Sequence, residues 1–397
     1  MKSDKTNLTG GANQSKLREY NERAILSLIR RHGSIAKSEL AKLSGLSAQS
    51  VSVIMRELEK DELLLRGELQ KGKVGQPSVP MRLNPEGVFT LGLKIGRRRA
   101  ELVLMDFVGE IRKGVHIIYL YPTVGNILQF VTQSIPALIE ALTEQQQKRI
   151  IGLGVAMPFE LWSWAEKIGA PQAEMDSWKE QNLTQLLEQA CDYPISVLND
   201  ATSACAAELV FGCGASLTDY CYLFIGYFIG GGIVLNHSIF PGPHSYAGAL
   251  GPMIVTGPDG NQSQLIDHAS IALLEQQLKD QEIATDFLWD DLDDWSKHPS
   301  AVQHWVDYIA KYLAIAIVST CSVIDFASIV IDGAFPSVIR EKIVIAVERE
   351  MQRLDLQGII IPQILAAQLA KDPRVIGSTC LPLFKHYLLD QNLLFKS

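Results

Sequence analysis

The chain of 397 residues is long enough for two or three domains with cores of their own, and its composition, 47% hydrophobic and 20% charged, is that of a soluble globular protein. Its charge is unevenly divided: residues 1–85 carry 15 Lys and Arg against 9 Asp and Glu, whereas residues 86–397 carry 21 against 35. A basic module joined to an acidic body predicts one part that seeks phosphates and one that does not.

The sequence also argues against a membrane or secreted protein. Residues 1–16 lack an apolar signal core and are predicted to form a disordered arm. The most apolar stretch, 312–334, contains Thr320, Asp325 and Asp332, so a buried helix followed by a buried strand explains it better than a membrane span. The six cysteines show no CxxC or CxC spacing, which favours buried thiols in a reducing cytoplasm.

Residues 17–85 are predicted to form a winged helix-turn-helix domain. Helical periodicity from Leu17 gives a first helix closed by Gly33, and then a second helix, a turn at Gly45 and a third helix follow. Ser47 stands where the third helix needs an N-cap. The apolar face of that helix carries Val51, Ile54 and Leu58.

The other face of the third helix carries small or hydrogen-bonding side chains, which suit base edges and phosphates in a major groove. The residues expected at DNA are Ser47, Gln49, Ser50, Ser52 and Arg56, with Lys37 and Ser38 on the phosphate backbone. An ordinary helical hairpin in an α-rich domain would show similar spacing.

A wing is predicted where residues 64–66 and 79–83 pair as short strands around the polar loop 70–78. The loop residues expected near a phosphate or minor groove are Lys71, Lys73 and Gln76. A plain surface hairpin is the alternative for this tip.

After Asn84 the pattern changes to strands and alternating βα units, which predicts an α/β body of two similar lobes. The expected elements are three strands over 88–120 with turns at 96–99 and 108–110, helix 126–147, strand 150–157, helix 182–191, strand 195–198, helix 201–211, strands 220–227 and 232–235, and one strand, 328–331, in a helical C-terminal third.

Five motifs follow one another along the chain: the winged hairpin, LNDATSACAAELVFG (198–212), IGYFIGGGIVLN (225–236), PGPHSYAGALGPM (241–253) and VIDGAFP (330–336). In these motifs the chain, from about Asn21 to Leu389, resembles the ROK family (repressors, open reading frames, kinases), specifically a repressor-type member. The resemblance implies that residues 86–397 form an actin/hexokinase-like (ribonuclease H-like) body, with lobes at about 86–198 plus the C-terminal helix and at 199–380. It also implies a sugar-sized ligand in the cleft between the lobes.

The resemblance further implies that kinase chemistry is lost. Kinases of the family carry Asp-x-Gly-Gly-Thr on their first hairpin, where the Asp helps organise Mg²⁺; the corresponding segment here begins Lys94-Ile95-Gly96-Arg97. A lysine in place of that carboxylate repels the metal, so magnesium-dependent phosphoryl transfer is not expected, although a cationic loop could still hold an anion. The glycines 230–232, a phosphate loop in the kinases, are expected to make only a tight hairpin.

Zinc-bearing members of the family have a Gly-Glu-x-Gly-His motif followed by a Cys-x-Cys-(x)4-Cys knot. The matching segment here, 248–252, has neither the Glu nor the His, and no cysteine follows it, so tetrahedral zinc cannot assemble from this segment. The neighbouring His244 and His268 are expected to be hydrogen-bonding residues. No metal and no cofactor are therefore expected.

The resemblance places sugar contacts at Asn199 and Asp200, a pair whose Asp is the catalytic base in the kinases. Asp200 could instead cap the helix that starts at Ala201. Without an ATP loop, we expect Asp200 to act as a ligand contact or a structural acceptor.

Ala249 and Pro252 replace two further sugar contacts of the family, which predicts an altered pocket. Phe159 and Glu160 are expected to compensate, because aromatic faces stack on sugar rings and carboxylates accept from hydroxyls. An aromatic packing cluster is the alternative. The remaining residues assigned to the ligand site are Gly231 and His244.

The function expected is that of a cytoplasmic transcriptional regulator, a repressor of carbohydrate uptake or catabolism genes. A homodimer or homotetramer binds a double-stranded operator, and a carbohydrate-like effector in the degenerate kinase cleft shifts the placement of the DNA-binding heads. Two alternatives are a sugar kinase with an appended DNA-binding head, and a regulator controlled by a protein partner.

Overall fold

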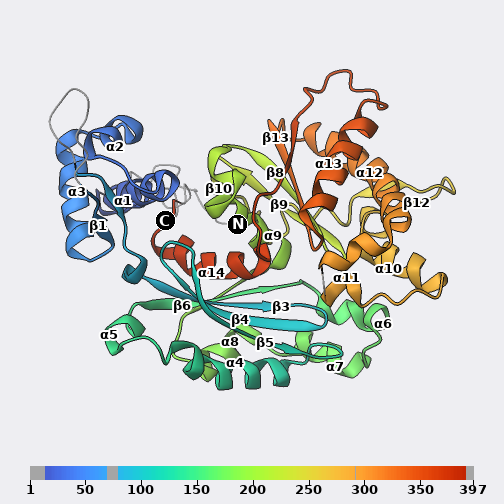
Figure 1. Ribbon diagram of the computed structural model, residues 1–397, viewed down its shortest axis with the longest axis horizontal. Helices are drawn as coiled ribbons and strands as arrows, with labels where there is room; N and C mark the ends of the chain where they lie inside the picture. Colours follow the sequence, from blue (N-terminus) through green and yellow to red (C-terminus); the bar gives the residue numbers. More distant parts are fainter. Residues whose placement is uncertain (1–13, 69–78, 291, 390–397) are drawn as a thin grey trace, which may run out of the picture. The chain divides into compact units, whose positions relative to one another are not determined.

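The computed structural model describes residues 14–68, 79–290 and 292–389 (Figure 1). The chain divides into two compact units, unit 1 with residues up to 155, 160–197 and those from 379, and unit 2 with residues 156–159 and 198–378. Residues 1–13 of the predicted arm and the three predicted wing-tip contacts Lys71, Lys73 and Gln76 lie outside the described residues.

Unit 1 begins with the head, which we define as residues 14–68 and 79–85. Its elements are α1 (Gln14–His32), α2 (Lys37–Ser44), α3 (Ala48–Lys60), β1 (Leu64–Arg66) and β2 (Met81–Leu83). Gly33 and Gly45 follow α1 and α2 with φ of +70° and +69°, the left-handed conformation that stops a helix and that glycine adopts without strain. β1 and β2 pair antiparallel, so the three predicted helices and the pair of wing strands are present. Two bounds are corrected: α1 begins at Gln14, so residues 14–16 of the predicted disordered arm are helical, and the second wing strand begins at Met81 instead of Val79.

The rest of unit 1 is built on a sheet ordered β5-β4-β3-β6-β7. Its strands are β3 (Phe89–Ile95), β4 (Arg99–Asp106), β5 (Ile111–Ile118), β6 (Ile150–Met157) and β7 (Ile195–Asn199). One face is covered by α4 (Val124–Ile139) and α8 (Leu183–Ala190), and α14 (Pro373–His386) lies over the other (Figure 1). Shorter helices are α5 (Glu144–Gln147), α6 (Ala165–Ile168) and α7 (Gln172–Glu180).

The single helix predicted over 126–147 is wrong. The structure has α4 and then α5, because Thr143 opens a new helix with a capping box. Its side chain accepts from the backbone N–H of Gln146, whose side chain accepts in turn from the Thr143 N–H.

Unit 2 repeats this plan with the sheet order β10-β9-β8-β13-β14. The strands are β8 (Tyr220–Ile225), β9 (Ile229–Leu235), β10 (Ser238–Ile239), β13 (Ser328–Gly333) and β14 (Gln363–Ala366), with a separate pair, β11 (Ile254–Thr256) and β12 (Gln262–Gln264). In both sheets an antiparallel three-strand meander is followed by two further strands, so the prediction of two similar α/β lobes is confirmed. Strand β14 was not predicted; it pairs parallel with β13 at the sheet edge.

The alternation of side chains along β8 assigns the two faces of this sheet. Cys221, Leu223 and Ile225 enter the main hydrophobic core with α10 (Ile271–Asp280), α12 (Pro299–Cys321) and α13 (Ser337–Met351). The even-numbered side chains point the opposite way, toward α9 (Asp200–Phe211). The predicted buried helix and strand over 312–334 are α12 and β13, and no helix of the described residues has the length and apolar character needed to cross a bilayer.

Glycines 230–232 do not form the expected turn but lie inside β9. A Cβ atom on Gly230 would come within 2.8 Å of the Ala201 Cβ atom, and one on Gly232 within 2.7 Å of the Cys205 Cβ atom. The glycines therefore allow α9 to approach β9 closely, and the hairpin prediction is corrected accordingly.

Candidate functional site

The third helix of the head has one buried and one open face. Val51, Ile54, Met55 and Leu58 are buried, as the apolar spacing predicts. On the opposite face Gln49, Ser50 and Arg56 are exposed, and Ser52 is partly exposed. The four polar side chains expected at DNA are thus accessible together.

Ser47 caps α3, as predicted. Its Oγ atom accepts the backbone N–H of Ser50 at 3.0 Å and lies 2.9 Å from the Ser50 Oγ atom. The cap fixes the first turn of α3, where residues that read base edges are placed in helix-turn-helix proteins.

The start of α2 has a different character. Its N-cap is Ala36, which supplies no side-chain acceptor, so the first N–H groups of the helix, at Lys37 and Ser38, are not capped by a side chain. Both residues are exposed. An uncapped helix start beside a lysine is suited to a phosphate oxygen, in keeping with the expected role of these two residues.

The wing base is tied to α3 by Arg66. Its guanidinium donates to both carboxylate oxygens of Glu59, at 2.6 and 3.2 Å, and the hydrogen bond from Arg66 lowers the pKa of Glu59 below its ordinary value. This pair sets β1 against the C-terminal turn of α3.

Helix α1 is bonded to the C-terminal end of α14, within unit 1. The buried Arg23 guanidinium donates to the carbonyl oxygens of Phe384 at 2.9 Å and Lys385 at 2.7 Å, and it pairs with Glu19. The Ser27 Oγ atom accepts the backbone N–H of Leu389 at 3.3 Å. Arg23 therefore satisfies carbonyls that the end of α14 leaves without helical partners.

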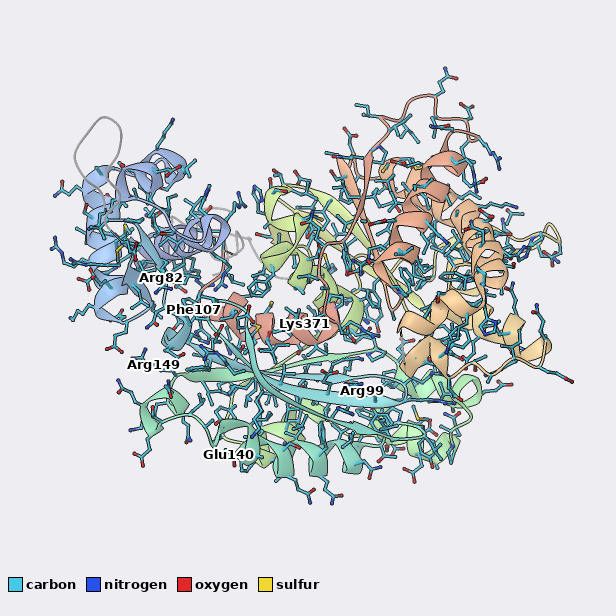
Figure 2. The ribbon with its side chains drawn as sticks, viewed as in Figure 1. Arg82, Arg99, Phe107, Glu140, Arg149 and Lys371 are labelled. Atoms are coloured by element: carbon cyan, nitrogen blue, oxygen red, sulfur yellow. The ribbon has the colours of Figure 1, made fainter. Side chains whose placement is uncertain are left out.

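A second arginine of α1 packs beside this end. The Arg30 guanidinium lies 5.1 Å from the ring centroid of Phe107, the residue labelled in Figure 2. The Phe107 ring also meets Tyr387 edge to face at 5.4 Å. Burial lowers the pKa of Arg30 to about 10.

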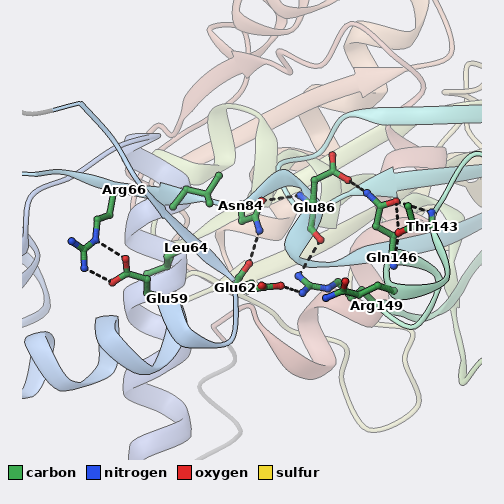
Figure 3. A pocket seen from close by; sticks show the side chains of 11 residues that line it. Glu59, Glu62, Leu64, Arg66, Asn84, Glu86, Thr143, Gln146 and Arg149 are labelled. Carbon is green, nitrogen blue, oxygen red and sulfur yellow. Dashed lines mark hydrogen bonds and ion pairs between the residues drawn. The ribbon is translucent and has the colours of Figure 1, made fainter.

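On its other side the head meets the lobe along an open groove of about 470 Å³ (Figure 3). Asn84 donates to the carbonyl of Glu62 at 2.6 Å, Arg149 pairs with the Glu62 carboxylate, and Gln146 donates to Glu86 at 2.5 Å. The polar groups along the groove therefore bond mainly to one another and join the head to α5 and β6. We call this set the junction network.

In unit 2 the Asn199–Asp200 pair lies at the start of α9. Asn199 is the N-cap, and its Oδ1 atom accepts from the N–H groups of Ala201 and Thr202 at 3.0 and 3.3 Å. The capping alternative therefore belongs chiefly to Asn199, although Asp200 also accepts from Ala201 at 3.0 Å. Both side chains remain partly exposed.

The start of α9 is bonded to strand β9. Thr202 donates to the carbonyl of Gly231 at 3.2 Å. A Cβ atom on Gly231 would lie 3.0 Å from the carbonyl oxygen of Gly248, and one on Gly248 would lie 2.6 Å from the Gly232 Cα atom. The structure thus brings Asn199, Asp200 and buried Gly231 together with the 241–253 loop.

The other residues predicted to bind the ligand are Phe159, His244 and Glu160, and each has a different environment. The rings of Phe159 and Tyr246 have centroids 5.3 Å apart and planes tilted by 58°. His244 is exposed on the same loop as Tyr246. Glu160 is exposed and has a left-handed backbone, φ +57° and ψ +38°, which costs a residue other than glycine about 1 kcal/mol. Residues with such strained backbones are enriched at functional sites.

Two residues near this site were missed. Tyr246 was not singled out because one aromatic in a loop carries no periodic signal. Arg374 pairs with Asp372 through two bonds of 3.0 and 2.9 Å, and its guanidinium lies 4.9 Å from the Phe224 ring centroid. Burial acts to lower the pKa of Arg374, but Asp372 and, more weakly, Asp200 raise it above its ordinary value, so a cation lies near Asp200.

Two further predictions concern the lysine in the former kinase loop and the histidines near the former zinc motif. Lys94 is buried in β3, opposite Glu101 of β4. His268 bonds to Ser263 at 2.6 Å and Tyr308 at 2.9 Å and stacks on Tyr312, so its expected hydrogen-bonding role is confirmed. Within 14–68, 79–290 and 292–389, no three His, Cys, Asp or Glu side chains cluster as metal ligands would.

Unit 2 also contains a buried ion pair that the sequence did not reveal. The Asp332 carboxylate accepts from Arg340 at 2.8 Å and from the Tyr222 hydroxyl at 2.7 Å. Burial raises the pKa of Asp332 to about 6, because removing a carboxylate from water disfavours its charged form.

Comparison with known proteins agrees with this architecture. The sequence profile of the ROK family matches residues 90–383, and a profile described as winged helix-turn-helix DNA-binding matches residues 18–64. The xylose repressor of Caldicellulosiruptor bescii is 25% identical over 252 residues, which cover 62% of this chain and 61% of that protein.

Solved structures share the fold. A ROK family transcriptional regulator, a homologue of the E. coli MLC protein, aligns with a TM-score of 0.67 and 20% identity over 96% of this chain and 100% of its own. The ROK family glucokinase of Streptomyces griseus, in complex with glucose and AMPPNP, aligns with a TM-score of 0.58 and 20% identity over 74% of this chain and 98% of its own. The chain therefore belongs to the ROK family, with an actin-like kinase fold and an N-terminal winged helix-turn-helix, and is a DNA-binding transcriptional regulator.

Proposed function

We propose that this regulator is a repressor of carbohydrate uptake or catabolism genes and responds to a sugar-like effector. The observation that carries the proposal is the N-capped, open polar face of α3 on a head bonded to a kinase-like lobe. The xylose repressor among its relatives supports a sugar as the class of signal. Residues 17–85 are the DNA-binding domain, and residues 86–397 are the ligand-sensing body.

In this proposal Gln49, Ser50, Ser52 and Arg56 contact the major groove and Lys37 and Ser38 the phosphates. The test uses full-length protein and an operator selected from random-sequence duplexes. Gln49→Ala with Arg56→Ala should weaken operator binding by about 100-fold, as expected when two polar side chains are removed from a DNA interface. The control Arg353→Ala removes an exposed charge in unit 2 and should leave affinity unchanged. Unchanged affinity in the double variant contradicts the assignment.

The effector is assigned to Asn199, Asp200, Gly231, His244, Phe159 and Glu160. Glu160→Gly tests this directly, because it removes the carboxylate and relieves the left-handed strain at the same position. We expect thermal stability to be unchanged or slightly raised, while stabilisation by the cognate sugar falls. A sugar panel that stabilises no sample would favour control by a protein partner.

The body is proposed to be non-catalytic. ATP consumption with Mg²⁺ and the same sugar panel should equal the buffer rate. Sugar-dependent turnover that Asp200→Asn abolishes would establish the kinase alternative instead.

We propose a homodimer as the DNA-binding species, because two heads can then meet half-sites about 34 Å apart. Light scattering of the free protein and of the operator complex tests this, and a tetramer is the other expected state. A monomeric complex contradicts it.

A further inference from the structure

An aromatic corner lies on the surface of unit 2, formed by Phe159 and Tyr246. The two rings meet at 58° with centroids 5.3 Å apart, and neither belongs to the main core of the unit. Tyr246 is 49% exposed and Phe159 is half-buried, so part of the corner reaches solvent. Two tilted rings suit a planar apolar group, which can face one ring and present its edge to the other.

The loop that carries Tyr246 has a defined position. Ala247 donates to the Pro241 carbonyl at 3.0 Å, Ala249 donates to the Tyr246 carbonyl at 3.0 Å, and Gly248 packs directly on Gly232 of β9. Gly248 has φ +81°, a conformation that keeps this close approach free of strain only for glycine. The Tyr246 side of the aromatic corner is therefore preorganised.

Strand β9, on which Gly248 packs, also contacts the start of α9, where polar side chains are available for recognition. Thr202 bonds α9 to Gly231, beside the Gly248 contact, and places Asn199 and Asp200 at the start of the helix. The Asn199 Oδ1 atom is used by the cap, whereas its Nδ2 amide has no hydrogen-bond partner in the part of the chain that the structure describes. The same loop exposes Ala249 and Pro252, whose side chains cannot hydrogen bond.

The geometry points to an effector with two chemically different parts, which we infer to be a glycoside with an aromatic aglycone. The hydroxyls of its sugar meet the Asn199–Asp200 end, and its aryl group enters the Phe159–Tyr246 corner. A free sugar would leave the corner in water. This inference rests on the proposed effector site and specifies its ligand class.

The test compares phenyl and methyl β-D-xylosides and β-D-glucosides by calorimetric titration of the full-length protein. We expect a phenyl glycoside to bind about tenfold or more tightly than the methyl glycoside of the same sugar. Tyr246→Ala should abolish that difference, whereas Tyr246→Phe should retain it. Phe240→Ala removes a 44% exposed aromatic ring near the same loop and should have no effect.

Equal binding of phenyl and methyl glycosides overturns the inference, as does an equal loss of both in Tyr246→Ala. Operator binding is measured on the same samples. If the protein binds its operator but none of the four glycosides, the ligand class is wrong while the regulator function stands. If it binds no operator, the proposed function itself fails.

Discussion

The guanidinium of Arg23 donates to the carbonyl oxygen of Phe384 at 2.9 Å, across 361 residues of sequence. The contact joins the first helix of the DNA-binding head to the C-terminal end of α14. The Arg23 side chain is only 6% exposed, and its bonds also reach Lys385 and Leu388. Deleting a buried charged side chain that bonds several carbonyls costs far more free energy of unfolding than deleting one partner of a surface ion pair.

Arg23→Ala should therefore destabilise the docking of the head on the lobe by about 2–3 kcal/mol. Hydrogen exchange at Leu388 and Leu389 measures this locally, because the Leu389 N–H is bonded to Ser27 in the same contact. The control Arg31→Ala changes an exposed arginine on the same helix and should alter stability by no more than about 0.5 kcal/mol. Equal exchange in the two variants contradicts the buried role of Arg23.

The Glu62–Arg149 pair of the junction network should contribute much less. Glu62 is 58% exposed and Arg149 21%, so solvent screens their interaction. A double-mutant cycle with Glu62→Gln and Arg149→Ala should give a coupling free energy below about 1 kcal/mol that decreases with added salt. A coupling as large as the effect of Arg23→Ala would show that both contacts secure the head equally.

Two substitutions at Ser47 separate stability from DNA binding. Ser47→Ala removes the acceptor for the Ser50 N–H and should cost about 1 kcal/mol in urea denaturation of the head. Ser47→Asp keeps a capping acceptor, and its negative charge is favourable at a helix N-terminus, so stability should be retained. The same charge repels phosphates, and operator affinity should fall by tenfold or more in a gel-shift titration. Retained affinity in Ser47→Asp would place DNA away from this end of α3.

The buried Asp332 predicts a pH effect on unit 2. Its pKa of about 6 exceeds the value of about 3.9 for an unfolded chain, so the folded protein retains a proton that the unfolded chain releases. The resulting stability is complete below about pH 4 and is lost as the pH rises through 6, a change of about 3 kcal/mol. Urea midpoints of the parent and Asp332→Asn, read by fluorescence that includes the buried Trp295 and Trp305, should converge over this interval without crossing.

The variant should also be less stable at pH 7, because Arg340 keeps its charge and loses its partner. Asp325→Asn serves as the control and should follow the parent curve. Parallel curves for the parent and Asp332→Asn contradict the shifted pKa.

The head could be predicted in detail because its signals are local. Gly33, Gly45 and Ser47 end or begin helices through their own backbone and side-chain chemistry, and α3 places Val51, Ile54 and Leu58 on one face by periodicity. Strand β14 has no such signal, because its four residues form a strand only through the neighbouring β13.

The candidate site was less predictable because its contacts join distant segments. The helix was predicted to begin at Ala201, whereas α9 begins at Asp200, so the main cap is Asn199 and not Asp200. Residues 230–232 were expected to form a turn but lie in β9, where Gly230 and Gly232 allow α9 to pack closely. The role of Arg23 was not predicted, since nothing near it in sequence indicates a partner 361 residues away.

The Arg23 contact has a consequence for biosynthesis. The head is translated before the lobe and has the local contacts it needs to fold early, but the carbonyl of Phe384 that holds α1 is translated 361 residues after Arg23. Until those residues leave the exit tunnel, α1 lacks its anchor on the lobe. A nascent chain that does not yet extend past Leu388 therefore carries α3 on an undocked head, and α3 reaches the geometry of the mature regulator only after these residues have emerged.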